Sequence, residues 1–545
     1  MKSLTIGFRR FLPSFPLLGK ELVEQASRRR TYALRAAMII FIMIIMAVMM
    51  ENNKAFSGPN MSIRDLSYLG EQIFVVIMIC QLFAAVILLP GMMSTVITSE
   101  KERSSLELLF LTQMKPRDII LQKYLSRIIP MLMFFFLGLP LIAVAYSFGG
   151  LSGRDVYELP VFVIISMLQI GAFSLMLSAF FATTAEAVVC SYLAVILDGF
   201  FFYYFIVFCE ETGFLNEDKA IYLFMAFQLV STVLFLFLGV KFLKGRSEVR
   251  RRHYFRKLLD FLDRLWFDMN RLYGGFQVIK EERDPLPNDS PIAWYEKIKS
   301  PVGRISYKVR LALIAYVPVL LCLMLKLPVM DRHESAIWFQ TILVIYLLVT
   351  AIFLCVSGAT VISSERTNQT LDVLLTTPVR SEDIVREKMK RGRAYVTVFC
   401  MPIIILSLLV NDKYYFDTEY LKEGIILLIV IFFVFFPLIS WVSCLCGLLI
   451  KSQVRAIFTA FMLMLAWLAS PLLLMLLERY SYRDDSFLFF IAYGSPGFSI
   501  YEAFFENTRY FEPIAFYICS GGMFMLYLFL RSVCIRNADK YIRRR

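Results

Sequence analysis

The sequence predicts an all-α polytopic membrane protein with about twelve transmembrane helices, arranged as two parallel six-helix repeats with amphipathic cytoplasmic helices. Three observations lead to this prediction: an apolar composition, a series of long apolar runs and an internal repeat. Hydrophobic residues make up 58% of the 545 residues, and charged residues only 19%. A water-soluble fold of this composition would expose large apolar patches, so a lipid environment fits it better.

The apolar runs are long enough to cross a bilayer, whose hydrocarbon core requires roughly 20 residues of α-helix. In the N-terminal half we expect spans near residues 33–50, 72–97, 127–149, 159–182, 187–209 and 219–243. In the C-terminal half we expect them near residues 309–328, 336–362, 394–410, 421–450, 454–477 and 511–533. Because each half has six spans, both halves begin on the same side of the membrane.

The distribution of Lys and Arg predicts the orientation. The formal net charge is +13, and basic residues gather before the first span, in residues 98–126 and 241–310, and at the C-terminus. Such segments belong in the cytoplasm by the positive-inside rule. We therefore expect an inner-membrane protein with both termini in the cytoplasm. Membrane lipid explains the charge, and no nucleic acid partner is expected.

The first part of the internal repeat precedes the first span of each half. The segments are FPLLGKELVEQASRRRTYALR at 15–35 and SPIAWYEKIKSPVGRISYKVR at 290–310. They align without a gap, so that Pro16 matches Pro291, Glu21 matches Glu296, and Arg35 matches Arg310. Each segment predicts a helix that leads directly into a span.

The second part of the repeat follows the second span of each half. VITSEKERSSLELLFLTQMKPRDIILQK begins at Val96, and VISSERTNQTLDVLLTTPVRSEDIVREK begins at Val361. Matched pairs include Glu100 with Glu365, Leu106 with Leu371, Glu107 with Asp372, Leu109 with Leu374, Thr112 with Thr377, and Lys123 with Lys388. Each copy predicts a short helix, a turn and a charged helix that enters the third span. Ser99 and Glu102 have the spacing of a capping box at the start of the first short helix.

These two segments resemble the loop of type-2 ATP-binding-cassette (ABC) permeases, which carries a Glu and an Arg, then Thr-Leu-Glu-x-Leu-Leu and Thr-Thr-Pro. The segments at 15–35 and 290–310 are similar to the connecting helices of that family. The resemblance implies that each loop is a coupling element that docks on an ATPase. The matching residues are Glu100, Arg103, Leu106, Glu107, Leu109 and Thr112 in the first copy, and Glu365, Arg366, Leu371, Asp372, Leu374, Thr377 and Pro378 in the second. Gln113 stands where the second copy has Pro378, so the two contacts are expected to be unequal.

The resemblance divides the chain into a first permease half (1–243), a cytoplasmic linker with an amphipathic helix (244–289) and a second permease half (290–545). The phosphate-binding pattern GxxxxGK followed by Ser or Thr is absent from the sequence. ATP and Mg are therefore expected on separate ABC ATPase subunits, of which two fused halves imply two copies. The chain itself is not expected to be an enzyme. Export of an unidentified substrate rests on the resemblance alone.

Three ionisable residues fall within or beside the expected spans, where charge is costly and often functional. Glu186 and Arg455 lie at corresponding turns into the fifth span of each half. They either pair across the repeat interface or are solvated at those turns. Asp198 lies deeper in the fifth span, where it faces a substrate path or makes a structural hydrogen bond.

Two other classes of function remain open from the sequence. A secondary transporter with two six-helix halves has the same helix count, although the loop after the second span is long for that class. A non-transporting scaffold would dock proteins through the same basic loops. A metal site is not expected, because no Cys or His cluster with ligand spacing occurs.

Overall fold

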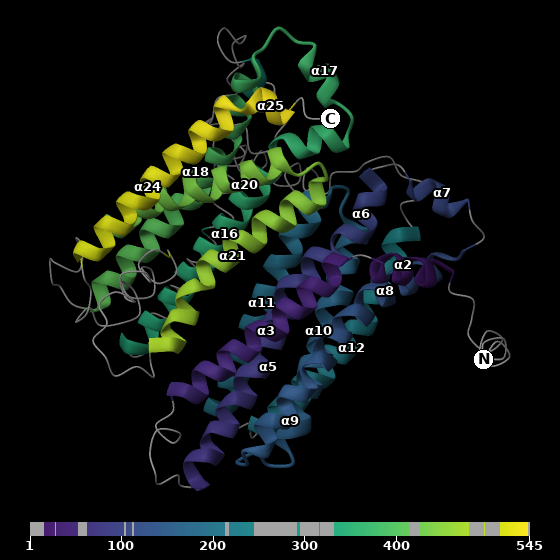
Figure 1. Cartoon of the computed structure of the whole chain (residues 1–545), viewed down its shortest axis with the longest axis vertical. Helices are drawn as coiled ribbons and strands as arrows, with labels where there is room; N and C mark the ends of the chain where they lie inside the picture. The colour runs from purple at the N-terminus through teal and green to yellow at the C-terminus, as the bar shows by residue number, and fades with distance from the viewer. Residues whose placement is uncertain are drawn as a thin grey trace, which may run out of the picture. The chain divides into compact units, whose positions relative to one another are not determined.

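The computed structural model describes residues 16–27, 29–52, 63–102, 105–111, 114–212, 217–244, 291–294, 316, 332–414, 425–478, 495 and 513–542. Within these ranges the chain is helical almost throughout and contains no β-strand. The described residues up to 244 form one compact unit, and those from 291 onward form a second (Figure 1). The predicted all-α class is confirmed. The predicted linker at 244–289 lies almost entirely outside the described residues.

The first unit contains a helix for each of its six predicted spans. Its elements are α2 (Pro16–Ala26), α3 (Arg29–Asn52), α5 (Ile63–Met93), α6 (Thr95–Glu102), α7 (Leu106–Phe110), α8 (Pro116–Leu137), α9 (Leu139–Ser147), α10 (Asp155–Phe180), α11 (Thr184–Thr212) and α12 (Glu217–Lys244). The third predicted span is divided at Gly138, between α8 and α9. There the Gln81 side chain approaches so closely that a Cβ on residue 138 would overlap its amide nitrogen.

The second unit repeats this order of elements. It contains α16 (Arg332–Thr367), α17 (Leu371–Leu375), α18 (Ser381–Tyr414), η2 (Ile431–Phe435), α20 (Phe436–Leu449), α21 (Gln453–Glu478), α24 (Pro513–Arg536) and α25 (Ala538–Ile542). The π-helical turn η2 ends two residues before Pro437, which has no backbone N–H for the usual α-helical bond. The predicted span at 309–328 lies outside the described residues, apart from Tyr316.

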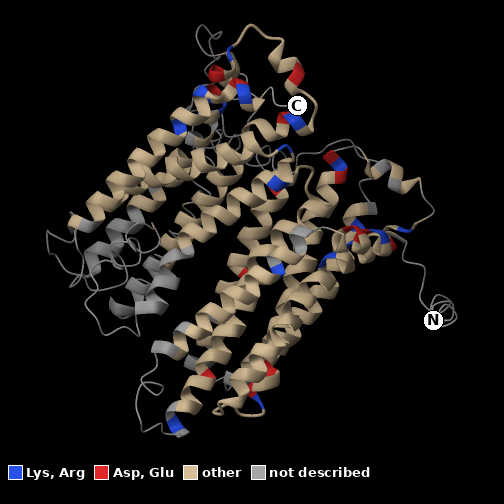
Figure 2. Ribbon diagram, in the orientation of Figure 1, with Lys and Arg blue, Asp and Glu red and all other residues tan. Residues whose placement is uncertain are grey.

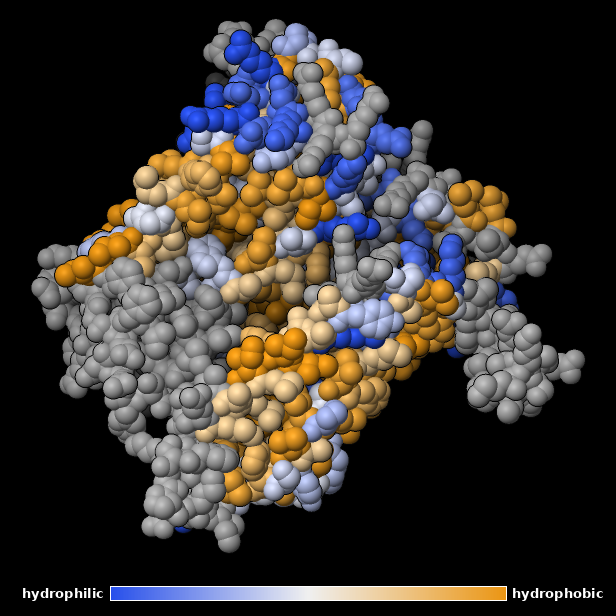
Figure 3. All heavy atoms as spheres, in the orientation of Figure 1, coloured by the Kyte–Doolittle hydropathy of each residue, from blue (hydrophilic) through white to orange (hydrophobic). Residues whose placement is uncertain are grey.

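Eight of the described helices are long and apolar enough to cross a membrane, and two shorter apolar helices accompany them. The outward faces of the helices are largely hydrophobic (Figure 3). Charged side chains gather near the helix ends, with long uncharged stretches between them (Figure 2). This pattern is expected of helices solvated by lipid, where a charged group at mid-depth is costly. The chain is therefore a multi-pass membrane protein.

Close helix packing in the second unit depends on two glycines. A Cβ on Gly358 of α16 would lie 2.6 Å from the Ser440 carbonyl oxygen, and a Cβ on Gly447 of α20 would lie 2.4 Å from the Ala359 carbonyl oxygen. Small residues allow such close backbone approach between membrane helices, where dispersion contacts drive association.

One expectation about the loop was wrong. Ser99 lies inside α6 and not at a helix start, because the helical region of the second span continues with a single break to Glu102. The capping box is therefore absent, and the carboxylate of Glu102 has another role, described below.

The glycine contacts give the first prediction. Gly447→Ala forces a Cβ onto backbone that cannot move aside, so we expect a loss of about 1–3 kcal/mol. Thermal unfolding of the purified chain, followed by tryptophan fluorescence, measures this as a lower Tm. Gly522→Ala in α24 is the control, because a Cβ there meets no described atom within 4 Å. Equal Tm values for the two variants would contradict the packing.

Candidate functional site

The second span ends in the same turn in both units. The backbone N–H of Ser105 donates to the Glu100 carbonyl oxygen at 3.0 Å, and the N–H of Thr370 donates to the Glu365 carbonyl oxygen at 3.0 Å. In the second unit Gln369 has a φ of +58°, and its N–H donates to the Arg366 carbonyl oxygen. This is the Schellman arrangement, which satisfies the last carbonyls of a helix and turns the chain away from it.

A short helix follows each turn and buries only one side. Leu106 and Phe110 of α7 pack against the core of the first unit. On the other side of this segment, Leu108 is 66% exposed and Leu111 is 82% exposed.

The second short helix has the same character. Leu371, Leu374 and Leu375 of α17 pack against a core cluster of the second unit, whereas Val373 is 68% exposed. Each loop thus presents apolar side chains on a surface that also carries charge.

A buried ion pair lies beneath each loop. Lys123 of α8 is 2% exposed, and its Nζ lies 2.6 Å from Glu100 Oε1. Lys388 of α18 is 6% exposed, and its Nζ also lies 2.6 Å from Glu365 Oε1. Burying a charge is expensive unless an opposite charge and hydrogen bonds meet it. Each pair therefore fixes the end of the second span against the start of the third.

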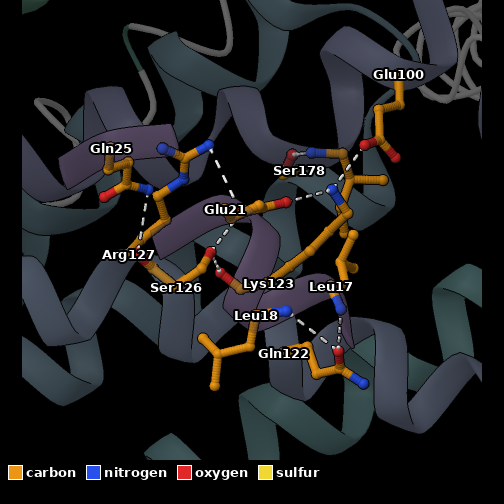
Figure 4. Close-up of polar contacts among 11 residues, drawn as sticks. Leu17, Leu18, Glu21, Gln25, Glu100, Gln122, Lys123, Ser126, Arg127 and Ser178 are labelled. Atoms are coloured by element: carbon orange, nitrogen blue, oxygen red, sulfur yellow. Dashed lines mark hydrogen bonds and ion pairs between the residues drawn. The ribbon is translucent and has the colours of Figure 1, made fainter. Parts of the chain in front are cut away.

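The residue before each lysine holds the N-terminus of the connecting helix. Gln122 Oε1 accepts hydrogen bonds from the backbone N–H groups of Leu17 at 3.0 Å and Leu18 at 3.3 Å (Figure 4). In the second unit, Glu387 Oε2 accepts them from Ile292 at 2.9 Å and Ala293 at 3.0 Å. These amides belong to the first turn of a helix, which has no internal acceptor for them. The contact is the same in both units, but only the second acceptor is charged.

Glu21 of α2 adds a further tie in the first unit. Its carboxylate accepts a hydrogen bond from Ser126 Oγ at 2.5 Å and lies 3.3 Å from Lys123 Nζ and 3.9 Å from Arg127 (Figure 4). Two carboxylates therefore face Lys123. We call Glu21, Glu100, Gln122 and Lys123 the first anchor, and Glu365, Glu387 and Lys388 the second anchor.

The loops are also tied to the end of the fourth span. Lys101 Nζ donates to the carbonyl oxygens of Ser178, Ala179 and Phe181, at 2.6–2.9 Å, where α10 ends. In the second unit Arg366 donates to the carbonyl oxygen of Leu448 at 3.0 Å, where α20 ends, and to that of Tyr541 at 2.5 Å. A cation complements the unsatisfied carbonyls and the dipole of a helix C-terminus.

Glu102 makes the corresponding contact with a helix start. Its carboxylate accepts a hydrogen bond from the N–H of Thr184 at 2.7 Å, in the first turn of α11. Lys101 and Glu102 together connect the second span to the junction between the fourth and fifth spans.

The remaining predicted loop and connecting-helix residues lie as follows. Asp372, Thr377 and Pro378 are exposed in and after α17. Arg35 of α3 lies over the rings of Tyr32 and Phe134, with its guanidinium carbon 5.7 and 5.6 Å from their centres. Pro16 and Pro291 both lie in helices. The structure does not describe Arg103, Thr112, Glu296 or Arg310, or the side chains of Glu107 and Leu109.

The three intramembrane candidates have different surroundings. Glu186 lies in the first turn of α11, where its negative charge complements the helix dipole. Arg455 is exposed near the start of α21. Asp198 Oδ1 accepts a hydrogen bond from Gln169 Nε2 of α10 at 3.2 Å. The pairing of Glu186 with Arg455 stays a prediction.

Sequence reasoning missed Lys101, Gln122 and Glu387, and it gave Glu102 a different role. The repeat alignment held a signal for two of them, because Gln122 and Glu387 occupy the same position before the matched lysines. The alignment also places Lys101, and not Arg103, opposite Arg366. Their partners are distant in sequence, so no local pattern reveals the contacts.

The second anchor gives a prediction about charge. Lys388→Met leaves the carboxylate of Glu365 without its partner, and we expect a loss of about 3–5 kcal/mol. The double variant Glu365→Met with Lys388→Met removes both charges and should recover much of that loss. Thermal unfolding of the two single variants and the double variant measures the coupling. Losses that simply add would contradict a direct pair.

The caps of the connecting helices give a third prediction. Gln122→Leu and Glu387→Leu each leave two buried or part-buried amides without their acceptor, so each should lower stability by roughly 1–3 kcal/mol. Glu387→Gln retains an acceptor and should lose less than Glu387→Leu, as a Tm comparison will show. Equal losses for these two would mean that charge, and not the cap, determines the effect.

The comparisons with known proteins agree with this arrangement. Residues 228–496 match the family described as ABC-2 family transporter protein. The matched region begins within α12, the sixth span of the first unit, and continues past the second copy of the loop, α20 and α21 to residue 496. No curated protein matches the chain significantly. Together with its apolar helices and its duplicated loop, this match over residues 228–496 makes the chain similar to the ABC-2 transporter family and supports an ABC-2 type membrane permease.

Proposed function

We propose that this permease works with separate ABC ATPase subunits and couples their ATP hydrolysis to export of a substrate across the membrane. Similarity to the ABC-2 family supports this, because permeases of that family normally work with ABC ATPase partners. The observation that carries the proposal is the loop after the second span, present twice and anchored by the same contacts both times.

The exposed sides of α7 and α17 are the proposed ATPase contacts. Leu108, Leu111 and Val373 are apolar and exposed on segments that the long apolar helices do not include. An exposed apolar side chain outside lipid is best stabilised by a partner protein. Asp372, Thr377 and Pro378 would form the polar edge of the second contact.

The anchors would transmit a displacement of the loops to the membrane-spanning helices. Lys123 and Lys388 join each loop to the third span, and Lys101 and Arg366 join it to the end of the fourth. A loop displaced by its ATPase would therefore move several spans together. Residues 1–243 and 290–545 would be the two permease halves, fused in one chain by the linker at 244–289.

ATP and Mg would bind to the ATPase subunits, of which we propose two copies for each chain. Both termini, the linker and both loops would face the cytoplasm, with the chain in the inner membrane. The two contacts would be unequal, because the cap acceptor is the amide of Gln122 in the first anchor and the carboxylate of Glu387 in the second. Pairing of Glu186 with Arg455 across the two halves is part of the same proposal. The family match favours this function over a secondary transporter.

Charge introduced on the loops tests the proposal. The variant with Leu108→Asp and Leu111→Asp should lose most of the ATPase that co-purifies with the chain, because a buried unpaired charge disrupts an apolar contact. Val373→Asp tests the second loop. Quantitative mass spectrometry of the affinity-purified chain measures the ratio of ATPase to permease.

Leu108→Met and Val373→Ile are the matched controls, because they keep the apolar surface. Each should retain the wild-type ratio. An unchanged ratio in both Asp variants would contradict docking through these loops, provided that their Tm values equal that of the wild type.

A further inference from the structure

Asp198 lies near the middle of α11, a helix long and apolar enough to cross the membrane. It is 14 residues beyond Thr184, or about 21 Å along α11 at the helical rise. An ionised carboxylate at this depth costs at least about 2.5 kcal/mol unless a partner compensates it. Such residues normally face the bundle interior or a water-filled path.

The described partner of Asp198 does not neutralise it. Gln169 donates one hydrogen bond to Oδ1 through its Nε2. The amide is neutral, so the negative charge is stabilised only in part. Among the described residues, neither Lys nor Arg forms an ion pair with Asp198 at the distances that define one.

Gln169 brings a second acceptor to the same place. Its side chain is 4% exposed, and its Oε1 is a buried oxygen without a hydrogen-bond donor among the described residues. A buried acceptor without a donor costs about 1–3 kcal/mol. The amide therefore points its donor at Asp198 and leaves its own acceptor unpaired beside a carboxylate. A single group that is cationic and donates hydrogen bonds would both neutralise the Asp198 carboxylate and pair with Gln169 Oε1.

An aromatic layer begins one helical turn beyond Asp198. It consists of Phe162 on α10, Phe201 and Phe202 on α11, and Phe224 and Phe227 on α12. Phe202 lies 5.2 Å from Phe162 and 4.7 Å from Phe224 between ring centres. Phe201 and Phe202 follow Asp198 by three and four residues, which places them one turn along the same side of α11. Aromatic faces attract cations and pack against apolar groups.

Space is available beside the carboxylate. Asp198 is only half-buried within the first unit, and a Cβ built on the adjoining Gly199 meets no described atom within 4 Å. The carboxylate of Asp198 is therefore partly accessible from outside the first unit, whereas the neighbouring Gln169 Oε1 is buried.

We propose that Asp198 and Gln169 form a recognition site for the ammonium group of an amphipathic organic cation, whose apolar body packs on the aromatic layer. This deepens the proposed function, because it names the substrate class of the permease. A primary ammonium has three donors, enough to meet Asp198 and Gln169 Oε1 together.

The probe is dansylcadaverine, a fluorescent amphipathic primary amine, titrated against the full chain in lipid nanodiscs with empty nanodiscs as the blank. Its N-acetyl derivative lacks the charge, and its N-trimethyl derivative keeps the charge but has no donor. We expect the primary amine to bind at least ~10-fold more tightly than the acetylated form, as a charge-assisted hydrogen bond predicts. The trimethyl form should lie between them.

The variants separate the two acceptors. Asp198→Asn should weaken binding of the primary amine by ~10-fold or more, bringing it near the acetylated form. Gln169→Leu should affect the primary amine more than the trimethyl form, because only the first donates hydrogen bonds. Asp198→Glu keeps the charge and should retain most of the binding.

Glu158→Gln is the matched control. This carboxylate lies on α10 as well, but near the helix end, where it pairs with Arg154. It should bind the probe as the wild type does, and Tm values identify any variant that is not folded. Equal binding of the charged and acetylated probes, or wild-type affinity in Asp198→Asn, would overturn the proposal and show that Asp198 has a structural role only. The titration requires no ATPase, so its failure is distinct from failure of ATPase docking.

Discussion

The interaction on which this permease most depends is the buried pair between a lysine and a glutamate at the base of each loop. Lys123 and Lys388 are almost fully buried, and an ammonium is stable there only when a carboxylate meets it. That carboxylate comes from the end of the preceding span, so two spans must meet for the charge to be compensated. The turn that follows the glutamate then directs the short helix away from the bundle. The ion pair in each unit therefore helps to determine where the exposed apolar residues of α7 and α17 lie.

The two anchors show how a duplicated structure keeps its backbone contacts while its charges change. In both units the backbone N–H groups of two consecutive residues donate to one side chain. The acceptor is the amide of Gln122 in the first unit and the carboxylate of Glu387 in the second. Lys101 and Arg366 both reach the last carbonyls of the fourth span with different cationic groups. The N-terminus of a helix needs a hydrogen-bond acceptor and its C-terminus needs a donor. More than one type of side chain is long enough to supply each. The two loops therefore rest on bases with different acceptor and cationic groups, which is the physical reason to expect unequal ATPase contacts.

Much of the fold could be predicted from the sequence because lipid imposes a simple constraint. A run such as residues 159–182 must form a helix to satisfy its backbone in hydrocarbon, and α10 is found there. The repeat alignment also paired Glu100 with Glu365 and Lys123 with Lys388. It did not show that each glutamate binds its lysine, because 23 residues separate them in the chain.

The prediction of a capping box at Ser99 was wrong for a related reason. Ser99 has the local pattern of a helix start, but the apolar contacts of Val96 and Ile97 continue the helical region of the second span past it. Packing therefore overrode a local signal. Glu102 binds Thr184 instead, a contact between positions 82 residues apart that no short pattern reveals.

The central claim is that one chain supplies both halves of a permease and receives two ATPase subunits on its two loops. Native mass spectrometry of the complex, purified intact from the membrane, tests this most directly. We expect one copy of this 545-residue chain with two ATPase subunits. A complex with two copies of the chain, or a chain that carries no ATPase, would contradict it.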